Sequence, residues 1–105
     1  MIELRQYADP EGRVPFRRWF DDLDAEAAVR VQRSLSRLAG GNTSHVRSVG
    51  EGVHEVKVDF GPGYRVYFGW EGNTIVILLG GGSKKRQDRD IATAHGRWME
   101  YKRRK

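Results

Sequence analysis

The stretch that decides the fold is Val53-His-Glu-Val-Lys-Val-Asp-Phe-Gly-Pro-Gly-Tyr-Arg-Val-Tyr-Phe-Gly-Trp70. Apolar and polar residues alternate on both sides of a central Gly-Pro-Gly, which indicates a β-hairpin. Successive side chains of a strand point to opposite faces, so one face of this hairpin should be apolar. The other face, which we interpret as the candidate working surface, should gather Glu55, Lys57, Asp59, Arg65 and Tyr67.

The run that follows the hairpin predicts the centre of a sheet. Residues 74–80 are almost wholly apolar without alternation, which is typical of a strand covered on both faces. We expect this strand to lie beside the hairpin. The triple glycine Gly80-Gly-Gly82 allows a sharp bend of the backbone, which would bring Lys84 and its basic neighbours to the rim of the sheet.

Helices are predicted before and after these strands. A first strand at residues 2–7 is followed by Pro15, which suits the start of a short helix, and by Asp24, a good N-cap for a second helix. A final helix is expected from about residue 87. The order β-α-α-β-β-β-α predicts an α+β fold, a small antiparallel sheet with two N-terminal helices packed on it and a C-terminal helix. The length predicts one domain, residues 1–105.

Composition argues against several functional classes. The chain has no cysteine, so disulfide scaffolds and thiolate sites are excluded. No apolar run is long enough to span a membrane, and the first residues lack the order of a signal peptide, so we expect a cytoplasmic protein without a membrane partner. The three histidines show no metal spacing, and the glycine runs match no nucleotide-binding motif. We therefore expect no metal and no cofactor.

Positive charge is concentrated near the C-terminus. The net charge is +5, and residues 84–105 hold nine basic and three acidic residues. Such a concentration predicts a polyanionic partner, most simply nucleic acid, although a solvated tail is the alternative. Arg47 belongs to a polar loop predicted over residues 42–52. The candidate RNA-binding residues are Arg47, Tyr67, Lys85, Arg86, Lys102, Arg103 and Arg104.

The residues that suit chemistry are cations. Lys57 and Arg65 are expected on the polar face of the hairpin and Lys84 at its rim, and cations suit a reaction that develops charge on a phosphate. His54 and Glu55 are neighbours in sequence, as in an acid/base pair. On a regular strand they point to opposite faces, so they cannot act together unless a bulge intervenes.

Several segments carry a family resemblance that covers nearly the whole chain. They are Pro15-Phe16 with Trp19, Val49-Gly-Glu-Gly-Val53 with Glu55, Phe60-Gly-Pro-Gly-Tyr-Arg-Val-Tyr-Phe68, and Gly81-Gly-Ser-Lys84 with Gln87, Asp90-Ile91 and Ala94. In these segments the chain resembles the HigB-like addiction module killer branch of the RelE/ParE toxin superfamily. The resemblance implies a compact RelE-like α+β fold and a toxin neutralised by a cognate antitoxin, often a helix-turn-helix protein. For the RelE and HigB branches it implies ribosome-dependent cleavage of mRNA.

The resemblance also implies roles for individual residues. Arg65 corresponds to the arginine that lies against the scissile phosphate in RelE-type toxins, and Lys57 and Lys84 fall near basic positions that contact the substrate. Where RelE carries a catalytic tyrosine in its C-terminal region, this chain has Asp90 or Ile91. The candidate general bases are therefore Asp90, Glu55 and His54.

These observations predict an mRNA endoribonuclease that works on the ribosome and without a metal ion. In this hypothesis Arg65, Lys84 and Lys57 are the catalytic residues, and the 2′-hydroxyl of the mRNA attacks the adjacent phosphate. The first alternative is a ParE-like toxin that poisons DNA gyrase and is no nuclease. The second is an inactive relative that binds only RNA or an antitoxin.

Overall fold

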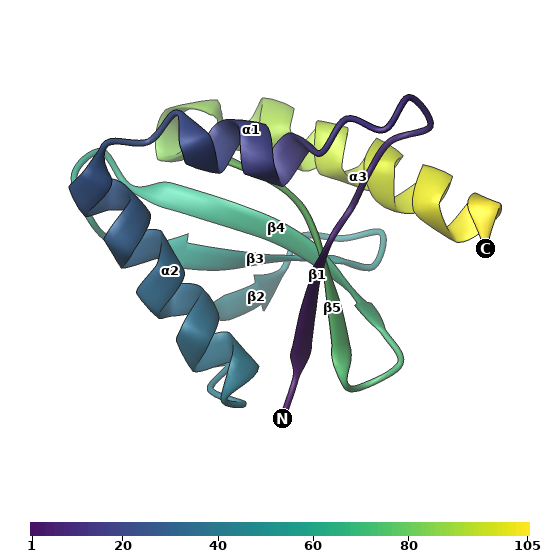
Figure 1. Ribbon diagram of the computed structural model, residues 1–105, viewed down its shortest axis with the longest axis horizontal. Helices are drawn as coiled ribbons and strands as arrows, with labels where there is room; N and C mark the ends of the chain where they lie inside the picture. Colours follow the sequence, from purple (N-terminus) through teal and green to yellow (C-terminus); the bar gives the residue numbers. More distant parts are fainter.

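The computed structural model describes residues 1–105 and has five strands and three helices (Figure 1). In chain order the elements are β1 (Glu3–Gln6), α1 (Pro15–Asp21), α2 (Ala25–Ala39), β2 (Val46–Ser48), β3 (Val53–Val58), β4 (Tyr64–Glu71), β5 (Ile75–Ser83), a short 3₁₀ helix η1 (Lys84–Arg86) and α3 (Gln87–Arg104).

One sheet contains all five strands, in the order β1-β5-β4-β3-β2. The predicted hairpin is β3 and β4, and β5 lies beside it as expected. The predicted α+β class, with two N-terminal helices and a C-terminal helix, is confirmed. The sheet is mixed, because β1 pairs with β5 in parallel. It also gains a strand within the predicted loop 42–52, where β2 pairs with β3.

Local sequence signals place the helix starts. Pro15 occupies the first turn of α1, where its missing N–H costs no hydrogen bond. The side chain of Asp24 accepts a hydrogen bond from the backbone N–H of Ala27 at 2.8 Å and so caps α2. Gly41 follows α2 with φ +95°, a left-handed conformation that a glycine adopts without strain.

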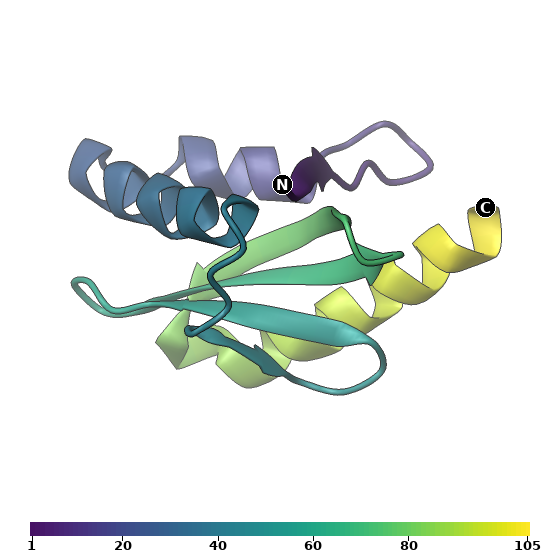
Figure 2. The ribbon, with the colours of Figure 1, turned by 90° about the horizontal axis from the view of Figure 1, so that it is seen from below.

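The helices cover both faces of the sheet (Figure 2). Helices α1 and α2 lie on one face and α3 on the other. The α1/α2 face buries the predicted apolar side of the hairpin, including Val56, Val66 and Phe68. The α3 face has its own core, in which Trp98 and Ala94 pack on Tyr67 and Val53. No helix combines the length and the apolar character that a membrane span requires.

The expectation of an open polar face on the hairpin is wrong. Lys57 and Asp59 are exposed, but Glu55, Arg65 and Tyr67 are buried. The reason is that the chain turns back after β5 and lays η1 and the start of α3 over this end of the sheet. The periodicity of α3 predicts that it has a buried side, but it contains no information about which face of the sheet it covers.

Candidate functional site

The predicted catalytic cations come together in one cavity, which we call the hairpin pocket. It has a volume of about 460 Å³. Strands β2, β3 and β4, the loop before β2, and the η1–α3 junction supply its lining: Ser44, His45, Val46, Arg47, Glu55, Lys57, Arg65, Lys84 and Gln87. Of the predicted site residues, the pocket thus contains all three catalytic cations, one candidate base and one RNA-binding residue.

Glu55 is the buried anion at the base of the hairpin pocket. Its side chain is only 2% exposed. Arg47 donates to its carboxylate at 2.6 Å, and the amide of Gln87 donates to both carboxylate oxygens, at 2.9 and 3.2 Å. These donors come from β2 and from the first residue of α3, so two elements distant in sequence fix one carboxylate. An ionised carboxylate buried this deeply needs such partners, because desolvation alone would be costly.

Arg65 lies beside Glu55 and is almost as deeply buried. Its Nε atom is 3.6 Å from Glu55 Oε2, which makes an ion pair, and its side chain is 6% exposed. Its Nη1 donates to the carbonyl of Tyr64 at 3.1 Å. The Nε has no hydrogen-bond partner. The guanidinium is therefore held in place while part of its hydrogen-bonding capacity stays unused.

Two lysines, Lys57 and Lys84, also line the hairpin pocket. The backbone N–H of Lys84 donates to the carbonyl of Gly63 at 2.9 Å, which ties the start of η1 to the tip of the hairpin. Lys57 is half exposed and lies 3.8 Å from Asp59, an ion pair that solvent weakens. Both ammonium groups are therefore available to an anion that enters the pocket.

His54 is on the opposite face of the sheet from Glu55, as strand alternation requires. Its ring stacks on Phe68 with the centroids 5.5 Å apart, and burial lowers its pKa. The structure therefore does not bring His54 into the hairpin pocket. No group of three or more carboxylate or imidazole side chains is placed to hold a metal ion.

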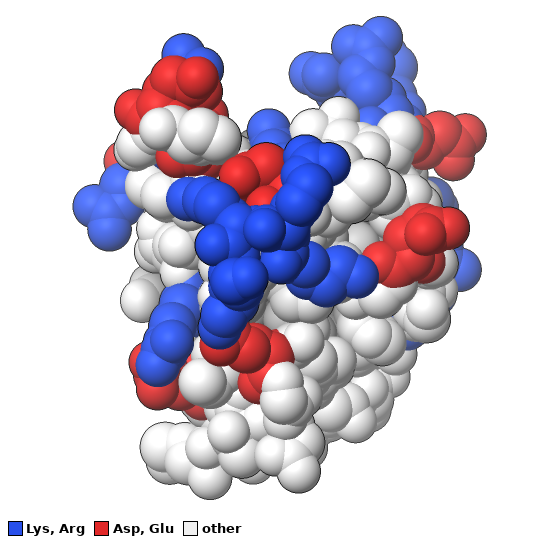
Figure 3. Space-filling view, turned by 90° about the vertical axis from the view of Figure 1, so that its right-hand side faces the viewer, with Lys and Arg blue, Asp and Glu red and all other residues white.

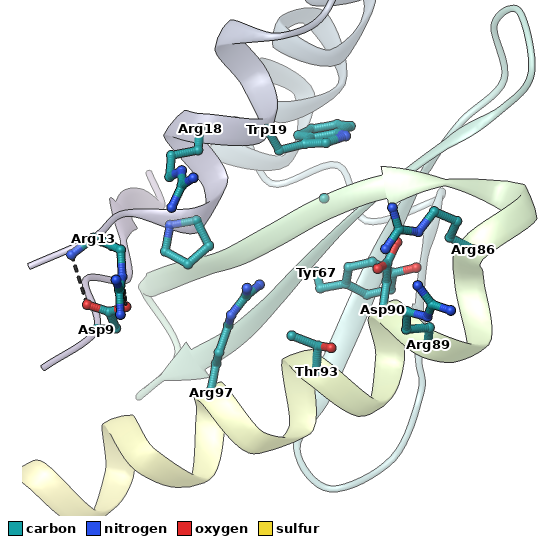
Figure 4. A pocket seen from close by; sticks show the side chains of 12 residues that line it. Asp9, Arg13, Arg18, Trp19, Tyr67, Arg86, Arg89, Asp90, Thr93 and Arg97 are labelled. Carbon is teal, nitrogen blue, oxygen red and sulfur yellow. Dashed lines mark hydrogen bonds and ion pairs between the residues drawn. The ribbon is translucent and has the colours of Figure 1, made fainter. Parts of the chain in front are cut away.

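A second cavity contains the remaining candidates, and we call it the edge groove. It runs between α1 and α3 along the outer edge of β5 and has a volume of about 350 Å³ (Figure 4). Its lining is rich in arginine: Asp9, Arg13, Pro15, Arg18, Trp19, Tyr67, Gly81, Arg86, Arg89, Asp90, Thr93 and Arg97. The predicted residues Tyr67, Arg86 and Asp90 are here and not in the hairpin pocket.

The polar groups of the edge groove are less well paired than those of the hairpin pocket. Burial raises the pKa of Asp90 even though Arg86, Arg97 and Arg89 lie near it. The hydroxyl of Tyr67 is buried without a hydrogen-bond partner, and this burial raises its pKa as well. Arg97 has a hydrogen-bond partner within the chain, because its Nη1 donates to the carbonyl of Leu79 at 3.0 Å.

The basic residues of the C-terminus form a third region, at the end of α3 (Figure 3). Lys and Arg side chains gather at the centre of this view, with carboxylates beside them. Arg104 pairs with Glu100 at 2.8 Å, and Lys105 pairs with Glu71. Lys102 and Arg103 have no acidic partner. Lys85, like Arg86, is exposed on η1 between the two cavities.

Gln87, His45 and most residues of the edge groove were not predicted as site residues. Gln87 follows the basic run directly, and a polar residue at the start of a helix beside that run is a signal that points to the site. The edge groove gives no such signal, because Arg13, Arg18 and Arg97 are far apart in sequence and have no common pattern.

Comparison with known proteins gives two matches. Residues 18–98 match the model of a family described as phage-derived Gp49-like proteins. An uncharacterized protein of Haemophilus influenzae is 39% identical over 80 residues, which cover 75% of this chain and 81% of the relative. The matched region includes both cavities except for Asp9, Arg13 and Pro15.

Proposed function

This chain belongs to the family of phage-derived Gp49-like proteins, a toxin-like family of the RelE/HigB type, and from this premise we propose that it is an mRNA-cutting toxin of a type II toxin–antitoxin system. In this proposal the chain is of the HigB-like branch, acts on mRNA held by the ribosome, and needs no metal ion. It works in the cytoplasm, where the ribosome is, and a cognate antitoxin, of the helix-turn-helix kind, neutralises it.

The observation that carries this proposal is the arrangement of cations around Glu55 in the hairpin pocket. Arg65 is fixed by its ion pair with Glu55 and by the carbonyl of Tyr64, and its Nε has no hydrogen-bond partner. Lys57 and Lys84 line the same pocket, and the exposed ion pair of Lys57 with Asp59 is weak enough for an anion to replace it. Preorganised donors of this kind stabilise charge that develops in a transition state, because they need little reorganisation when the reaction occurs.

The proposed reaction is a transesterification within the RNA. The 2′-oxygen forms a bond to the neighbouring phosphorus, and the bond from phosphorus to the 5′-oxygen of the next nucleotide breaks. The 2′-hydroxyl loses its proton to a base, and the departing 5′-oxygen takes up a proton. The products are a 2′,3′-cyclic phosphate and a 5′-hydroxyl. Arg65 and Lys84 stabilise the negative charge on the pentavalent phosphorus, and Lys57 orients the phosphate.

The proposed reaction needs a general base, and the sequence predicts three candidates for it. Glu55 is the candidate inside the hairpin pocket, but Arg47 and Gln87 already donate to its carboxylate. Asp90 is in the neighbouring groove, and His54 is on the opposite face. A protein equipped in this way neutralises a phosphate well but does little to align the 2′-hydroxyl with it. We propose that the ribosome supplies this alignment by fixing the path of the mRNA.

The engagement of Glu55 also favours a second candidate. The carboxylate of Glu55 already accepts from Arg47 and Gln87 and forms an ion pair with Arg65, whereas a ParE-like toxin that poisons gyrase needs no general base. The same fold serves both activities, so the fold alone does not separate them. An inactive relative that only binds RNA or an antitoxin is the remaining alternative.

The two activities are distinguished by inducing the protein in cells and mapping transcript 5′ ends. We expect growth arrest with new 5′ ends inside translated frames, and relief when the product of the neighbouring reading frame is made as well. DNA damage with intact transcripts would instead identify a gyrase poison. The absence of both effects would identify an inactive relative.

The ribosome and metal requirements are tested with purified protein. We expect cleavage of mRNA only when ribosomes are present, and equal cleavage in EDTA when the ribosomal subunits are cross-linked so that they stay together. Efficient cleavage of free RNA would show that the protein aligns the 2′-hydroxyl by itself. Loss of cleavage in EDTA under these conditions would contradict the proposed metal-independent reaction.

A further inference from the structure

The outer edge of β5 lacks a neighbouring strand over half of its length. Strand β1 pairs with β5 only from Ile75 to Leu78, and the backbone N–H of Tyr7 makes the last contact, with the carbonyl of Leu78. Strand β5 continues to Ser83, paired on its other side with β4. From residue 79 to residue 83 no strand of this chain pairs with that side of β5, and the one side chain that bonds its backbone is Arg97, which donates to the carbonyl of Leu79. Exposed edges of this kind are templates for the pairing of another chain.

Both faces of this edge are covered, so it is open only in the plane of the sheet. A Cβ atom at Gly81 would collide with the indole of Trp19 from α1. On the other face, Cβ atoms at Gly80 and Gly82 would collide with Arg97 and Asp90 from α3. The glycines thus let the two helix layers close tightly on the strand. The space that remains is the edge groove, a slot with residues of α1 on one side and residues of α3 on the other (Figure 4).

The slot has a positive rim and a buried donor without a partner. Five arginines line it, and only Arg13 takes part in an ion pair. Arg97 donates to the carbonyl of Leu79, which leaves Arg18, Arg86 and Arg89. The hydroxyl of Tyr67 lies in the lining with its oxygen fully buried and without a hydrogen bond. A buried hydroxyl left unpaired costs free energy, so its acceptor is expected to come from a ligand.

From these features we propose that the edge groove binds an extended, acidic segment of a partner protein, which pairs with residues 79–83 of β5 as an added strand. Side chains of an added strand alternate between the α1 and α3 sides. Acidic side chains on it would meet Arg18 on one side and Arg86 and Arg89 on the other. The inference rests on the proposed function in one respect, namely that this partner is the antitoxin encoded in the neighbouring reading frame.

A peptide fits these features better than RNA does. The backbone of β5 offers alternating donors and acceptors at the spacing of a strand, which only another polypeptide matches. The position also suits inhibition, because Gly82 of β5 pairs with Arg65 and Lys84 follows directly after β5. An occupant of the edge would lie along one side of β5, and the other side of β5 pairs with β4, the strand that carries Arg65.

The test uses purified full-length protein and the purified product of the neighbouring reading frame. The groove variant is Arg18→Glu with Arg89→Glu, and the matched control is Arg17→Glu with Arg33→Glu. All four residues are exposed, and the control pair lies outside the groove. We expect the groove variant to bind the partner at least tenfold more weakly and the control less than twofold more weakly. Hydrogen exchange of the wild-type complex is expected to show new protection of those amides of residues 79–83 that face away from β4.

Three results would overturn the inference. One is equal weakening by both variants, and another is protection that leaves residues 79–83 unchanged. The third is a tenfold loss of binding to a ten-nucleotide single-stranded RNA in the groove variant while partner binding is kept, which would assign the groove to RNA. Growth arrest by wild-type protein alone is recorded in the same strains. Its absence would refute the proposed toxin activity, whereas the binding data would still decide the inference.

Discussion

The hairpin pocket and the edge groove are both rich in cations, but the carboxylates inside them differ in their hydrogen bonding. Glu55 accepts from Arg47 and Gln87 and forms an ion pair with Arg65. Asp90 has arginines near it but receives no hydrogen bond from them, and burial raises its pKa. The carboxylate of the first cavity is fixed before a ligand arrives, whereas the carboxylate of the second accepts no hydrogen bond from the arginines near it. Hydrogen-bond satisfaction, more than the number of charges, therefore distinguishes a site suited to chemistry from one suited to binding.

The largest effect is expected for Arg65→Lys in the hairpin pocket. Lysine keeps the positive charge beside Glu55 but loses the planar set of donors, so the fold should survive while the transition state loses support. We expect ribosome-dependent cleavage to fall by about 100- to 1,000-fold. The matched change Arg97→Lys, in the edge groove, should reduce cleavage by less than about threefold, because it is remote from the reacting phosphate in this proposal. Similar losses of cleavage activity for the two variants would mean that the two cavities do not differ in their contribution to catalysis.

The next largest effects concern the carboxylates of the two cavities, Glu55 and Asp90. They are measured as the free energy of unfolding in urea at pH 7. Glu55→Gln removes the negative charge beside Arg65, whose side chain is 6% exposed, and leaves that arginine without a buried counter-charge. We expect the free energy of unfolding to fall by about 3 kcal/mol. A loss below about 1 kcal/mol would show that Glu55 contributes little beyond a neutral hydrogen-bond acceptor.

Asp90→Asn should have the opposite sign and a smaller size. Burial raises the pKa of Asp90 in the folded protein, so its ionised form is disfavoured by folding. This cost is absent below the ordinary pKa of 3.8 and is fully present once the pH exceeds the raised value. The variant should thus be more stable at pH 7, by less than about 1 kcal/mol because the site is partly open to solvent, and equal to wild type near pH 3.

The opposite outcome for Asp90 has a clear physical meaning. Asp90 lies in the first turn of α3, where the helix dipole favours a negative charge. If Asp90→Asn lowers stability at pH 7, the helix dipole and the nearby arginines outweigh burial. The contrast between the two carboxylates would then be one of degree only.

The elements of the fold could be predicted from the sequence because their signals are local. Pro15 and Asp24 mark helix starts, and the alternation around Gly61-Pro62-Gly63 marks the hairpin. The grouping of Lys57, Arg65 and Lys84 was also predictable, because two are on one face of one hairpin and the third follows the adjacent strand. Their roles in cleavage stay a prediction.

The parts that could not be predicted depend on how distant segments pack. Nothing in the alternation of β3 and β4 indicates that η1 and α3 cover Glu55 and Arg65. The short β1 leaves half of β5 without a neighbour, and this mismatch depends on a parallel pairing that no local pattern encodes. The edge groove follows from the mismatch, so it becomes visible only in the folded chain.

The smallest effect is expected from truncation of the basic tail. This truncation tests whether basic residues that already have an acidic partner in the chain contribute to RNA binding. Cutting the chain after Tyr101 removes Lys102, Arg103, Arg104 and Lys105. Stability should fall by less than about 1 kcal/mol, because the lost ion pairs of Arg104 and Lys105 are at the surface and Trp98 still anchors α3.

The salt dependence of RNA binding separates the four tail charges into two kinds. Each phosphate contact with single-stranded RNA contributes about 0.7 to the slope of log K against log salt concentration. If only the two residues without acidic partners, Lys102 and Arg103, contact phosphates, truncation should reduce the slope by about 1.4. If Arg104 and Lys105 leave Glu100 and Glu71 to bind RNA, the reduction should be about 2.8. The slope is measured for a single-stranded oligonucleotide from 50 to 200 mM salt, with Arg17→Glu as the control for loss of unrelated charge. An unchanged slope would mean that the tail is a solvated end that contacts no phosphate.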